Sequence, residues 1–570
     1  MITNKNAFWL LLIVCSLTLL PFIGLSDYHT KGEPRESIVS FSMLETGNWV
    51  LPRNNGGEMA YKPPFFHWCV AAVSAVRGGV TEGSSRLPSA LALIAMTMAT
   101  FCFFRKRTTT ALALTASLVA FTSFELHRAG ANCRVDMVLT ALTVCALYCL
   151  YRWYENGMRG VPLLAILLMG LGTLTKGPVG SIIPCLVMGI YMLLMRENFW
   201  KALGWLSLFG VLSFIPYALW FVAAWHQGGQ EFLDLMYEEN IGRMTNTMSY
   251  DSCVEPWYYN FLTILSGWIP YTLLALLALF LTGCLKNIGN LWNKSKISAV
   301  WKSRNNSPLD LFALTSIVTI FVFYCIPQSK RSVYLMPIYP FMGYFIARMI
   351  MWMSEWRTKP LNIFNGTLAT LSILLFVAFV ALKFVDVPDT MFHGRHALQN
   401  QMTVDALSGI SQWWQLLIVV VTTATGVLWW VYRKRVSRGV MAVAATLVLV
   451  LGIYLSLDGV YNPTVLNVKS IKEECASINL AAPADKGKLY EYMEVGVKAK
   501  GDPAHFFEVN FYLGNRIGSF HLEKPQRGFL LISEADFKLN EKQFTGEGYR
   551  FEKRYEEPKR KMQIYRFEKQ

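Results

Sequence analysis

Long apolar runs dominate the first 460 residues of this 570-residue chain. An α-helix needs about 20 apolar residues to cross a bilayer, and about thirteen runs approach that length. The predicted spans lie near residues 7–25, 86–104, 109–124, 136–152, 161–175, 179–195, 203–225, 259–283, 308–326, 333–352, 361–384, 413–432 and 440–457. The pattern predicts an all-α polytopic membrane protein.

A long polar interruption, residues 26–85, follows the first span. Within it, 33–46 carries Ile38, Phe41 and Met43 toward one side, and 63–78 is apolar but too short to cross a bilayer. Both segments predict helices that lie at the membrane surface. A long polar loop of this kind indicates an enzyme that works at a bilayer rather than a simple pore.

The last 110 residues or so are of a different kind, with dense charges of both signs. Short alternating runs, typical of strands, occur at 506–513, 528–533 and 562–567. We therefore predict a transmembrane domain at 1–457 and a small soluble α/β domain at 458–570. This tail has no Gly-rich phosphate loop and no nucleophile elbow, which favours a structural or acceptor-positioning role over catalysis.

Composition and charge support the membrane class. Only 16% of residues are charged, against about 25% in soluble proteins. The net charge of +15 comes from basic clusters between the apolar runs, so it fits the positive-inside rule and does not favour nucleic-acid binding. The same rule places the N-terminus, with 1–25 as an uncleaved first helix, in the cytoplasm. The loop 26–85 and the C-terminal domain then lie outside.

The predicted external loops also collect ionisable residues on one membrane face. Charges near a bilayer are costly, so a cluster of them indicates function, although ordinary solvated charge is the alternative for any single residue. The eleven cysteines are scattered, and none forms a cluster with zinc spacing.

Eight short motifs carry a resemblance to a known family. The first external loop contains GEPRE at 32–36, MLETGNWVLP at 43–52 and YKPP at 61–64. The others, in order along the chain, are RLPS at 86–89, RVDM at 134–137, TKGP at 175–178, ENxxR at 239–243 and SKRxxYxxP at 329–337. Together they resemble the polyprenyl-phosphate-dependent glycosyltransferases of the protein O-mannosyltransferase superfamily, closest to bacterial aminoarabinose (lipid A) transferase-like enzymes.

The resemblance implies a GT-C type fold and an activity. A sugar would pass, with inversion, from a polyprenyl-phosphate (undecaprenyl-phosphate) donor to a lipid A, lipid-linked glycan or protein acceptor. The reaction would take place on the outer face of a bacterial plasma (inner) membrane. A carboxylate would take the acceptor's proton, and fixed cations would neutralise the departing phosphate.

The resemblance also implies roles for named residues. The candidate catalytic acids are Glu33, Asp136 and Asp27. The candidate donor-phosphate ligands are Lys62, Arg35, Arg243, Lys330 and Arg331. The candidates for binding acceptor or sugar are Glu36, Tyr61, Trp257 and Tyr334.

Simpler interpretations stay open for several of these side chains. Arg35 and Glu36 could solvate a surface helix, Lys62 could reach the lipid headgroups, and Asp136 could cap its helix. For Trp257, an interfacial aromatic belt is favoured over sugar stacking.

Two departures from the family pattern leave the sugar and the metal dependence open. Many family loops carry Asp-Glu where this chain has Gly32-Glu33, and the aminoarabinose transferases carry Glu where it has Tyr61. We predict no structural metal and no firm cofactor, and dependence on a divalent cation is left open.

A transporter or flippase of a lipid-linked glycan is the competing class. Such a protein should show paired repeats with polar groups near mid-bilayer, and none is visible in the sequence. A structural or assembly subunit would explain the helical bundle but not the loop motifs.

Overall fold

The computed structural model describes residues 4–239, 254–282, 307–394, 396–494, 505–557 and 560–570. The chain forms two compact units. Unit 1 is Met1–Ser26, Arg86–Ala218 and Glu255–Val468, and unit 2 is Asp27–Ser85, Leu219–Val254 and Lys469–Gln570. The boundary expected between residues 457 and 458 stays a prediction.

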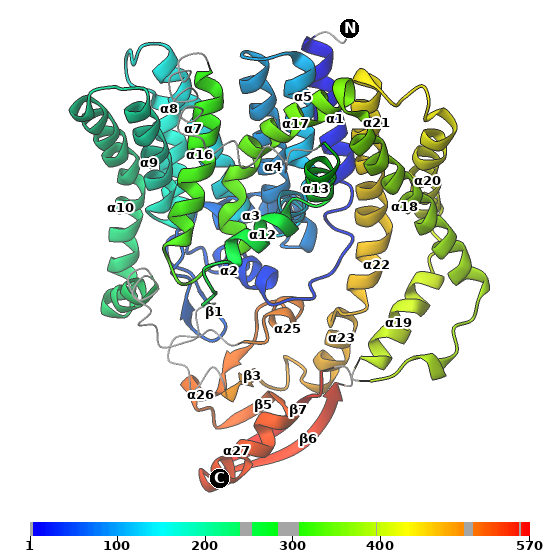
Figure 1. The fold of residues 1–570 in the computed structure, drawn as a ribbon. Helices are drawn as coiled ribbons and strands as arrows, with labels where there is room; N and C mark the ends of the chain where they lie inside the picture. Colours follow the sequence, from blue (N-terminus) through cyan, green and yellow to red (C-terminus); the bar gives the residue numbers. More distant parts are fainter. Residues whose placement is uncertain (1–3, 240–253, 283–306, 395, 495–504, 558–559) are drawn as a thin grey trace. The chain divides into compact units, whose positions relative to one another are not determined.

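Unit 1 is a bundle of helices, many of which run alongside one another (Figure 1). Its described elements, two of which (α4 and α10) extend into unit 2, are α1 (Asn4–Leu19), α4 (Glu82–Arg105), α5 (Thr110–Phe121), α6 (Phe124–Gly130), α7 (Val135–Glu155), α8 (Leu163–Lys176), α9 (Val179–Leu194), α10 (Phe199–Tyr237), α12 (Tyr259–Gly267), α13 (Tyr271–Leu281), α16 (Pro308–Cys325), η3 (Ser332–Ile338), α17 (Tyr339–Trp356), α18 (Thr358–Phe384), η4 (Asp389–Met391), α19 (Ala397–Ser408), α20 (Trp413–Tyr432), α21 (Gly439–Ser456), η5 (Leu457–Tyr461) and α22 (Asn462–Asn467).

Each predicted span falls on helix, and the polytopic membrane fold is confirmed. Within the described ranges, eight helices are long and apolar enough to cross a membrane, or up to ten if each of two bent pairs is one span. The predicted spans at 7–25, 161–175 and 179–195 coincide with shorter apolar helices.

The two bends were not predicted from the sequence. Helices α5 and α6 meet at 68°, and α12 and α13 meet at 99°. At the first bend, the hydroxyl groups of Thr122 and Ser123 donate to the carbonyls of Leu118 and Ala120. These side-chain bonds compete with the regular helical ladder and favour a helix end.

Unit 2 combines the first loop with the C-terminal segment. Its elements are α2 (Gly32–Thr46), β1 (Arg53–Asn54), β2 (Glu58–Met59), α3 (Phe65–Arg77), α23 (Lys472–Ala481), β3 (Leu489–Tyr492), α25 (Phe507–Tyr512), β4 (Gly518–Ser519), α26 (Phe520–Glu523), β5 (Arg527–Ser533), α27 (Glu534–Gly546), β6 (Tyr549–Glu557) and β7 (Met562–Lys569). The two predicted surface helices are thus present as α2 and α3.

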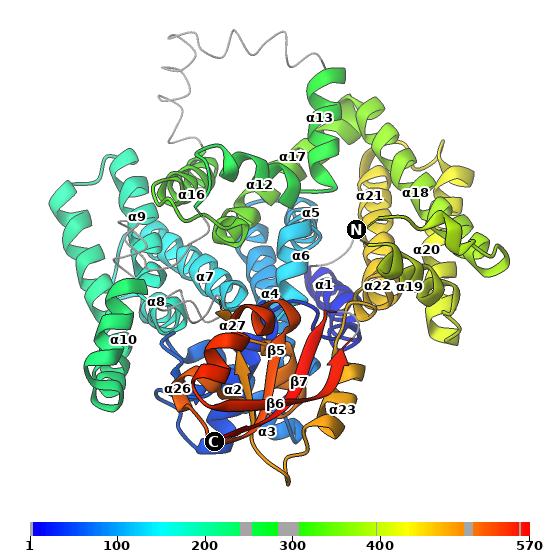
Figure 2. The ribbon, with the colours of Figure 1, turned by 90° about the horizontal axis from the view of Figure 1, so that it is seen from below.

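The C-terminal part of unit 2 is built on a mixed sheet with strand order β4-β3-β5-β7-β6. Strand β3 pairs in parallel with β4 and β5, and the other pairs are antiparallel. Alternate residues of β5 face two separate cores. Phe529 and Leu531 pack with residues of α23, while Leu530 and Ile532 pack with residues of α27, which lies over the strands in Figure 2.

The sequence prediction for this region was partly wrong. Two of the alternating runs form β5 and β7, but 506–513 forms the helix α25. The alternation there is misleading because Glu508 and Asn510 are buried together with the apolar residues between them. Asn510 uses its amide to bond to Asn515 and to the backbone of Ile517, so polarity does not mark an exposed face.

Arg86, the first residue of the RLPS motif, is almost completely buried, at 1% exposure. Its guanidinium donates to the carbonyl oxygen of Ile23 at 2.9 Å and to the hydroxyl of Ser26 at 3.1 Å. The end of α4 is thereby fastened to the chain that leaves the first helix. The motif arginine therefore has a structural explanation.

We expect Arg86→Leu to lower the stability of the protein by about 3 kcal/mol, because it leaves buried carbonyls without donors. The measurement is the thermal unfolding temperature of the purified protein in detergent. Arg77→Leu, at an exposed position of α3, is the matched control. Equal unfolding temperatures for the two variants would contradict the assignment.

Candidate functional site

The carboxylate of Glu36 is the centre of a buried ion cluster in unit 2. Helix α2 begins with Gly32, Glu33 and Pro34, a favourable order because an acid suits the positive end of a helix and proline suits its first turn. Glu36 follows on the face that packs against α3. Ser40, four residues further on, donates to the carbonyl oxygen of His67 at 3.1 Å and fixes the two helices together.

Three basic groups surround this carboxylate. Arg35 Nη2 lies 3.0 Å from Glu36 Oε1, and Lys62 Nζ pairs with the same oxygen. His67 Nε2 lies 3.0 Å from the other oxygen, Oε2. The side chain of Glu36 is only 6% exposed, whereas those of Arg35 and Lys62 are 33% and 31% exposed. A buried anion thus fixes two cations that still reach solvent.

Glu36 is ionised in this cluster. Burial raises its pKa, but the charges of Lys62 and Arg35 and the hydrogen bond to His67 outweigh burial and hold the pKa well below the usual range. Burial lowers the pKa of Arg35, but the same ion pair outweighs this effect and leaves that pKa raised. The cluster thus brings the two cations Arg35 and Lys62 to one buried anion.

Glu33 lies three residues before Glu36, and such pairs share one face of a helix. It is also buried. Its backbone carbonyl accepts a hydrogen bond from Ser37 at 3.1 Å, and the Ser37 hydroxyl lies 2.7 Å from that of Tyr28. Two carboxylates from one turn of α2 are therefore held in the interior of this loop. Tyr61 contributes to the electrostatic surroundings of Arg35.

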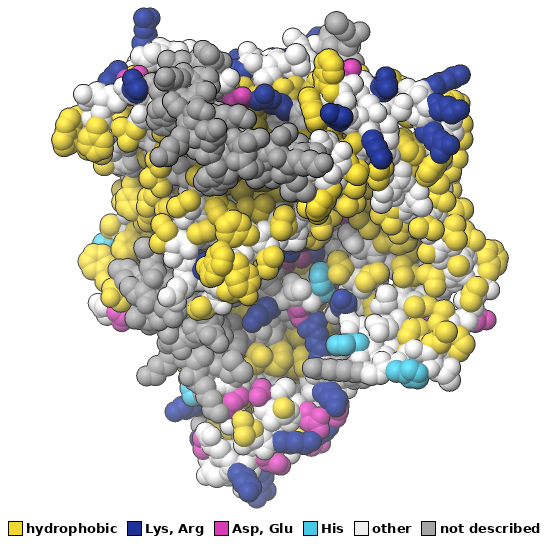
Figure 3. Space-filling model, in the orientation of Figure 1, with side chains coloured by type: hydrophobic (Ala, Val, Ile, Leu, Met, Phe, Trp, Pro, Cys, Tyr) yellow, Lys and Arg dark blue, Asp and Glu magenta, His cyan; other side chains and the backbone are white. Residues whose placement is uncertain are grey.

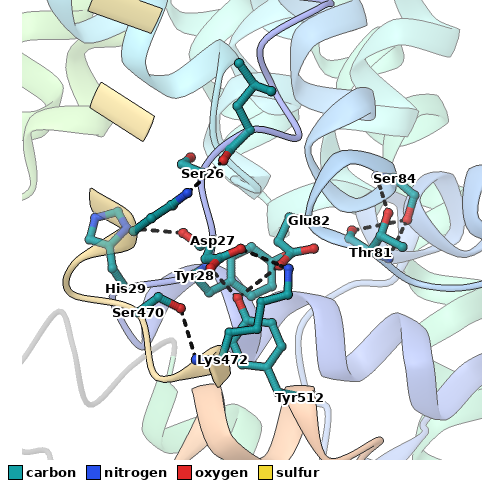
Figure 4. A network of polar contacts seen from close by, with 12 residues as sticks. Ser26, Asp27, Tyr28, His29, Thr81, Glu82, Ser84, Ser470, Lys472 and Tyr512 are labelled. Carbon is teal, nitrogen blue, oxygen red and sulfur yellow. Dashed lines mark hydrogen bonds and ion pairs between the residues drawn. The ribbon is translucent and has the colours of Figure 1, made fainter. Parts of the chain in front are cut away.

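Asp27 lies in a second polar network of unit 2. Lys472 Nζ lies 2.9 Å from Asp27 Oδ1 and 2.8 Å from Glu82 Oε1, and the hydroxyl of Tyr512 donates to Glu82 at 3.0 Å (Figure 4). The Asp27 carboxylate therefore helps to tie the start of the first loop to the C-terminal segment.

In unit 1, Asp136 lies in the first turn of α7 and pairs with Lys176. Lys176 ends α8, because the next residue, Gly177, has a φ of +76° that L-residues rarely adopt. Helices α8 and α9 then pack so closely that a Cβ on Gly180 would lie 2.3 Å from a backbone atom of Gly172. The TKGP motif is thus a tight turn between two helices that presents its lysine to Asp136.

Tyr334 completes this second group. The Lys176 ammonium lies 4.1 Å from the centroid of the Tyr334 ring, which stacks on Tyr324 at 5.3 Å. Nearby in the sequence, Lys330 is buried and donates to the carbonyl oxygens of Glu255 at 3.0 Å and Gln328 at 3.4 Å. Those bonds fit a structural lysine as well as a phosphate ligand.

Two other acids and cations of unit 1 are paired. Glu125 is buried and accepts from Arg128 at 2.8 Å and from Ser332 at 2.9 Å. His127 Nε2 lies 2.5 Å from Asp458 Oδ2. Arg331, the residue before Ser332, has further interactions in the structure.

The remaining candidates are placed as follows. Trp257 is 75% exposed, which fits an interfacial aromatic belt better than a closed sugar site. Arg243 lies outside the described residues. Within the part of the chain that the structure describes, no three His, Cys, Asp or Glu side chains are grouped so that they could hold a metal ion.

The sequence motifs placed Lys62, Arg35 and Glu36 in one loop, but His67 was missed and Lys176 was not among the candidate site residues. The signal for His67 was a polar residue in the first turn of an apolar segment, three residues after the YKPP motif. Glu33, Glu36 and Lys62 belong to unit 2, and Asp136 and Lys176 belong to unit 1. The structure brings Glu36 and Lys62 together in the one unit and Asp136 and Lys176 together in the other.

Comparisons with known proteins agree with this picture. The family model described as dolichyl-phosphate-mannose-protein mannosyltransferase matches residues 61–220. An uncharacterized protein from Aquifex aeolicus is 27% identical over 66% of this chain and 72% of its own length. An undecaprenyl phosphate-alpha-4-amino-4-deoxy-L-arabinose arabinosyl transferase from Proteus mirabilis is 25% identical over 62% of each chain. The chain thus spans less than two thirds of the length of that transferase.

Among solved structures, ArnT from Cupriavidus metallidurans bound to undecaprenyl phosphate matches 99% of this chain and 98% of its own, with a TM-score of 0.70 and 17% identity. The fold matches that of this ArnT, and the family model matches part of the chain, so the protein is similar to GT-C type membrane glycosyltransferases. The similarity extends to the aminoarabinose transferases, which is the resemblance that the sequence motifs indicated.

We expect Glu36→Gln to destabilise the protein by about 2–3 kcal/mol, because the cations lose their buried counter-charge. Thermal unfolding in detergent measures the effect. Glu45→Gln changes an exposed acid on the same helix and is the matched control. Identical unfolding of both variants would show that the cluster does not hold α2 against α3.

A further ion cluster in unit 2 predicts a pH dependence. His505 Nε2 lies 2.8 Å from Glu58 Oε1, and its Nδ1 pairs with Glu491. Burial lowers the pKa of His505, but the two carboxylates outweigh burial and raise it from 6.5 to about 10. This contact joins the β1–β2 hairpin of the first loop to strand β3.

Because the folded pKa is the higher one, the stabilisation by His505 is complete below about pH 6.5 and is lost progressively as the pH rises through about 10. The difference in unfolding temperature between the wild type and His505→Gln should therefore be largest at pH 6 and vanish near pH 10. His521→Gln, at an exposed position, should show no such trend. A gap of constant size would refute the ion cluster.

Proposed function

We propose that this protein transfers a sugar from a polyprenyl-phosphate donor to an acceptor on the outer face of a bacterial plasma membrane. The observation that carries the proposal is the pair of fixed cations in the first loop. Lys62 and Arg35 are held by a buried carboxylate and keep about one third of their side chains exposed. A phosphate that gains charge as it leaves is the partner that such a cluster suits.

The roles divide between cations and acids. Lys62 and Arg35 bind the donor phosphate, while Glu36 and His67 position them. Glu33 is the proposed base that takes the proton of the acceptor hydroxyl. Asp136, paired with Lys176, is a second acid that orients the acceptor or a cation. Asp27 is the weaker candidate because its carboxylate already bonds to Lys472.

The similar proteins support the donor class. The relative from Proteus mirabilis is an undecaprenyl phosphate-alpha-4-amino-4-deoxy-L-arabinose arabinosyl transferase, and the solved ArnT structure contains undecaprenyl phosphate. We accordingly propose an undecaprenyl-phosphate-linked sugar as donor and lipid A, a lipid-linked glycan or a protein as acceptor. The N-terminus lies in the cytoplasm in this proposal, and the first loop faces the opposite side.

Binding and transfer should respond differently to two substitutions. Lys62→Met should abolish binding of undecaprenyl phosphate to the purified protein and reduce sugar transfer by about 10²–10³-fold, because a charge on the leaving phosphate loses its counterion. Glu33→Gln should leave that binding intact and reduce transfer by about 10²–10⁴-fold, because only the proton acceptor is lost.

The binding is measured by native mass spectrometry, and transfer by mass spectrometry of envelope lipids and glycoproteins from cells that make each variant. Arg53→Gln, at a half-exposed cation of the same loop, is the control. Unchanged envelope glycans in both variants, at normal protein levels, would reject the enzyme and favour a transporter.

A further inference from the structure

A groove runs between α18 and α20 in unit 1. Its volume is about 1010 Å³. The α18 wall is formed by Thr358, Lys359, Asn362, Ile363, Gly366, Thr367, Thr370, Leu371 and Leu374, and the α20 wall with the turn after it by Trp429, Trp430, Arg433, Lys434 and Ser437.

The wall residues of α18 follow helical spacing, so they form one continuous stripe. From Thr358 to Leu374 the stripe spans sixteen residues, or about 24 Å at 1.5 Å per residue. That length exceeds one leaflet of the hydrocarbon core, which is about half of 30 Å. The groove is therefore long enough to hold a lipid chain together with its headgroup region.

The two ends of the groove differ in chemistry. Lys359 of α18 and Arg433 and Lys434 after α20 form its basic end, and all three are exposed. Ile363, Leu371 and Leu374 form the apolar end. Figure 3 shows Lys and Arg side chains gathered at the upper right of the molecule, above an apolar surface. The Arg433 guanidinium lies 5.3 Å from the centroid of the Trp430 ring, which also lines the groove.

Two polar atoms beside the groove lack partners among the described residues. The indole nitrogen of Trp429 is buried without an acceptor, and the amide oxygen of Asn362 is buried without a donor. Buried polar groups are normally satisfied, so two orphans on facing walls of one groove call for an explanation. An ester oxygen and a hydroxyl of a bound lipid are groups of the kind that they require.

We propose that this groove binds an anionic phospholipid of the bilayer, with its phosphate at Lys359, Arg433 and Lys434 and an acyl chain along Ile363, Leu371 and Leu374. Basic pockets between membrane helices are typical sites for anionic headgroups. Charge bias places this end of α18 and α20 in the cytoplasm, opposite the first loop, so the polyprenyl carrier of the proposed reaction is not the expected occupant. The proposal does not depend on the proposed function.

The test uses the full-length protein in a neutral detergent and native mass spectrometry. The probes are phosphatidylglycerol, phosphatidylcholine with the same acyl chains, undecaprenyl phosphate and inorganic phosphate. The wild type should bind phosphatidylglycerol at least about tenfold more tightly than phosphatidylcholine, since each basic residue near a headgroup adds to the affinity. The groove variant K359Q/R433Q/K434Q should lose this preference.

The matched control is R357Q/R435Q/R438Q, which removes the same charge from neighbouring exposed positions that do not line this groove. It should keep the preference, and elution and unfolding temperature should show that both variants fold. Equal binding of phosphatidylglycerol by the groove variant and the wild type would overturn the proposal. Displacement of phosphatidylglycerol by inorganic phosphate would also overturn it. So would displacement by undecaprenyl phosphate that occurs in the wild type and is absent in the groove variant.

Discussion

The first loop depends on one buried negative charge. The carboxylate of Glu36 holds Arg35 and Lys62 side by side against their mutual repulsion. The carboxylate in turn needs those cations, because burial alone would neutralise it. Its second oxygen bonds to His67 of α3. The same carboxylate therefore joins α2 to α3 and fixes the positions of the two cations. A surface loop thereby gains a rigid, positively charged feature.

Other charged residues of unit 2 follow the same rule at longer range in sequence. Lys472 joins Asp27 and Glu82, and His505 joins Glu58 and Glu491. In each case a basic side chain of the C-terminal segment lies between acids, at least one of them from the first loop or its end. The C-terminal segment thus contributes directly to the shape of the loop, which gives a physical content to the positioning role that its sequence suggested.

The sequence was sufficient for the broad architecture because apolar runs and caps act locally. It predicted the helices at 33–46 and 63–78 and the helical, polytopic membrane fold, and the motif residues indicated the glycosyltransferases to which the chain is similar. It could not predict that Lys62 pairs with Glu36, since that contact depends on how α2 packs on α3. The bends at Thr122–Ser123 and the helix at Phe507–Tyr512 were missed for a related reason. Hydrogen bonds from hydroxyl groups to the backbone leave no mark on the pattern of apolar and polar residues, and buried polar side chains distort it. Predictions from sequence depend on that pattern.

The depressed pKa of Glu36 also affects which acid of α2 can accept a proton. A carboxylate that is stabilised strongly as an anion is a weak base, so the acid that fixes the cations is poorly suited to accept a proton. Catalysis by displacement needs both an anchored counter-charge for the phosphate and a base for the acceptor. Two acids one helical turn apart meet both needs only if their surroundings differ. In this chain Glu36 is the one held between Lys62 and Arg35, and this is why the proposed reaction assigns the proton to Glu33 instead.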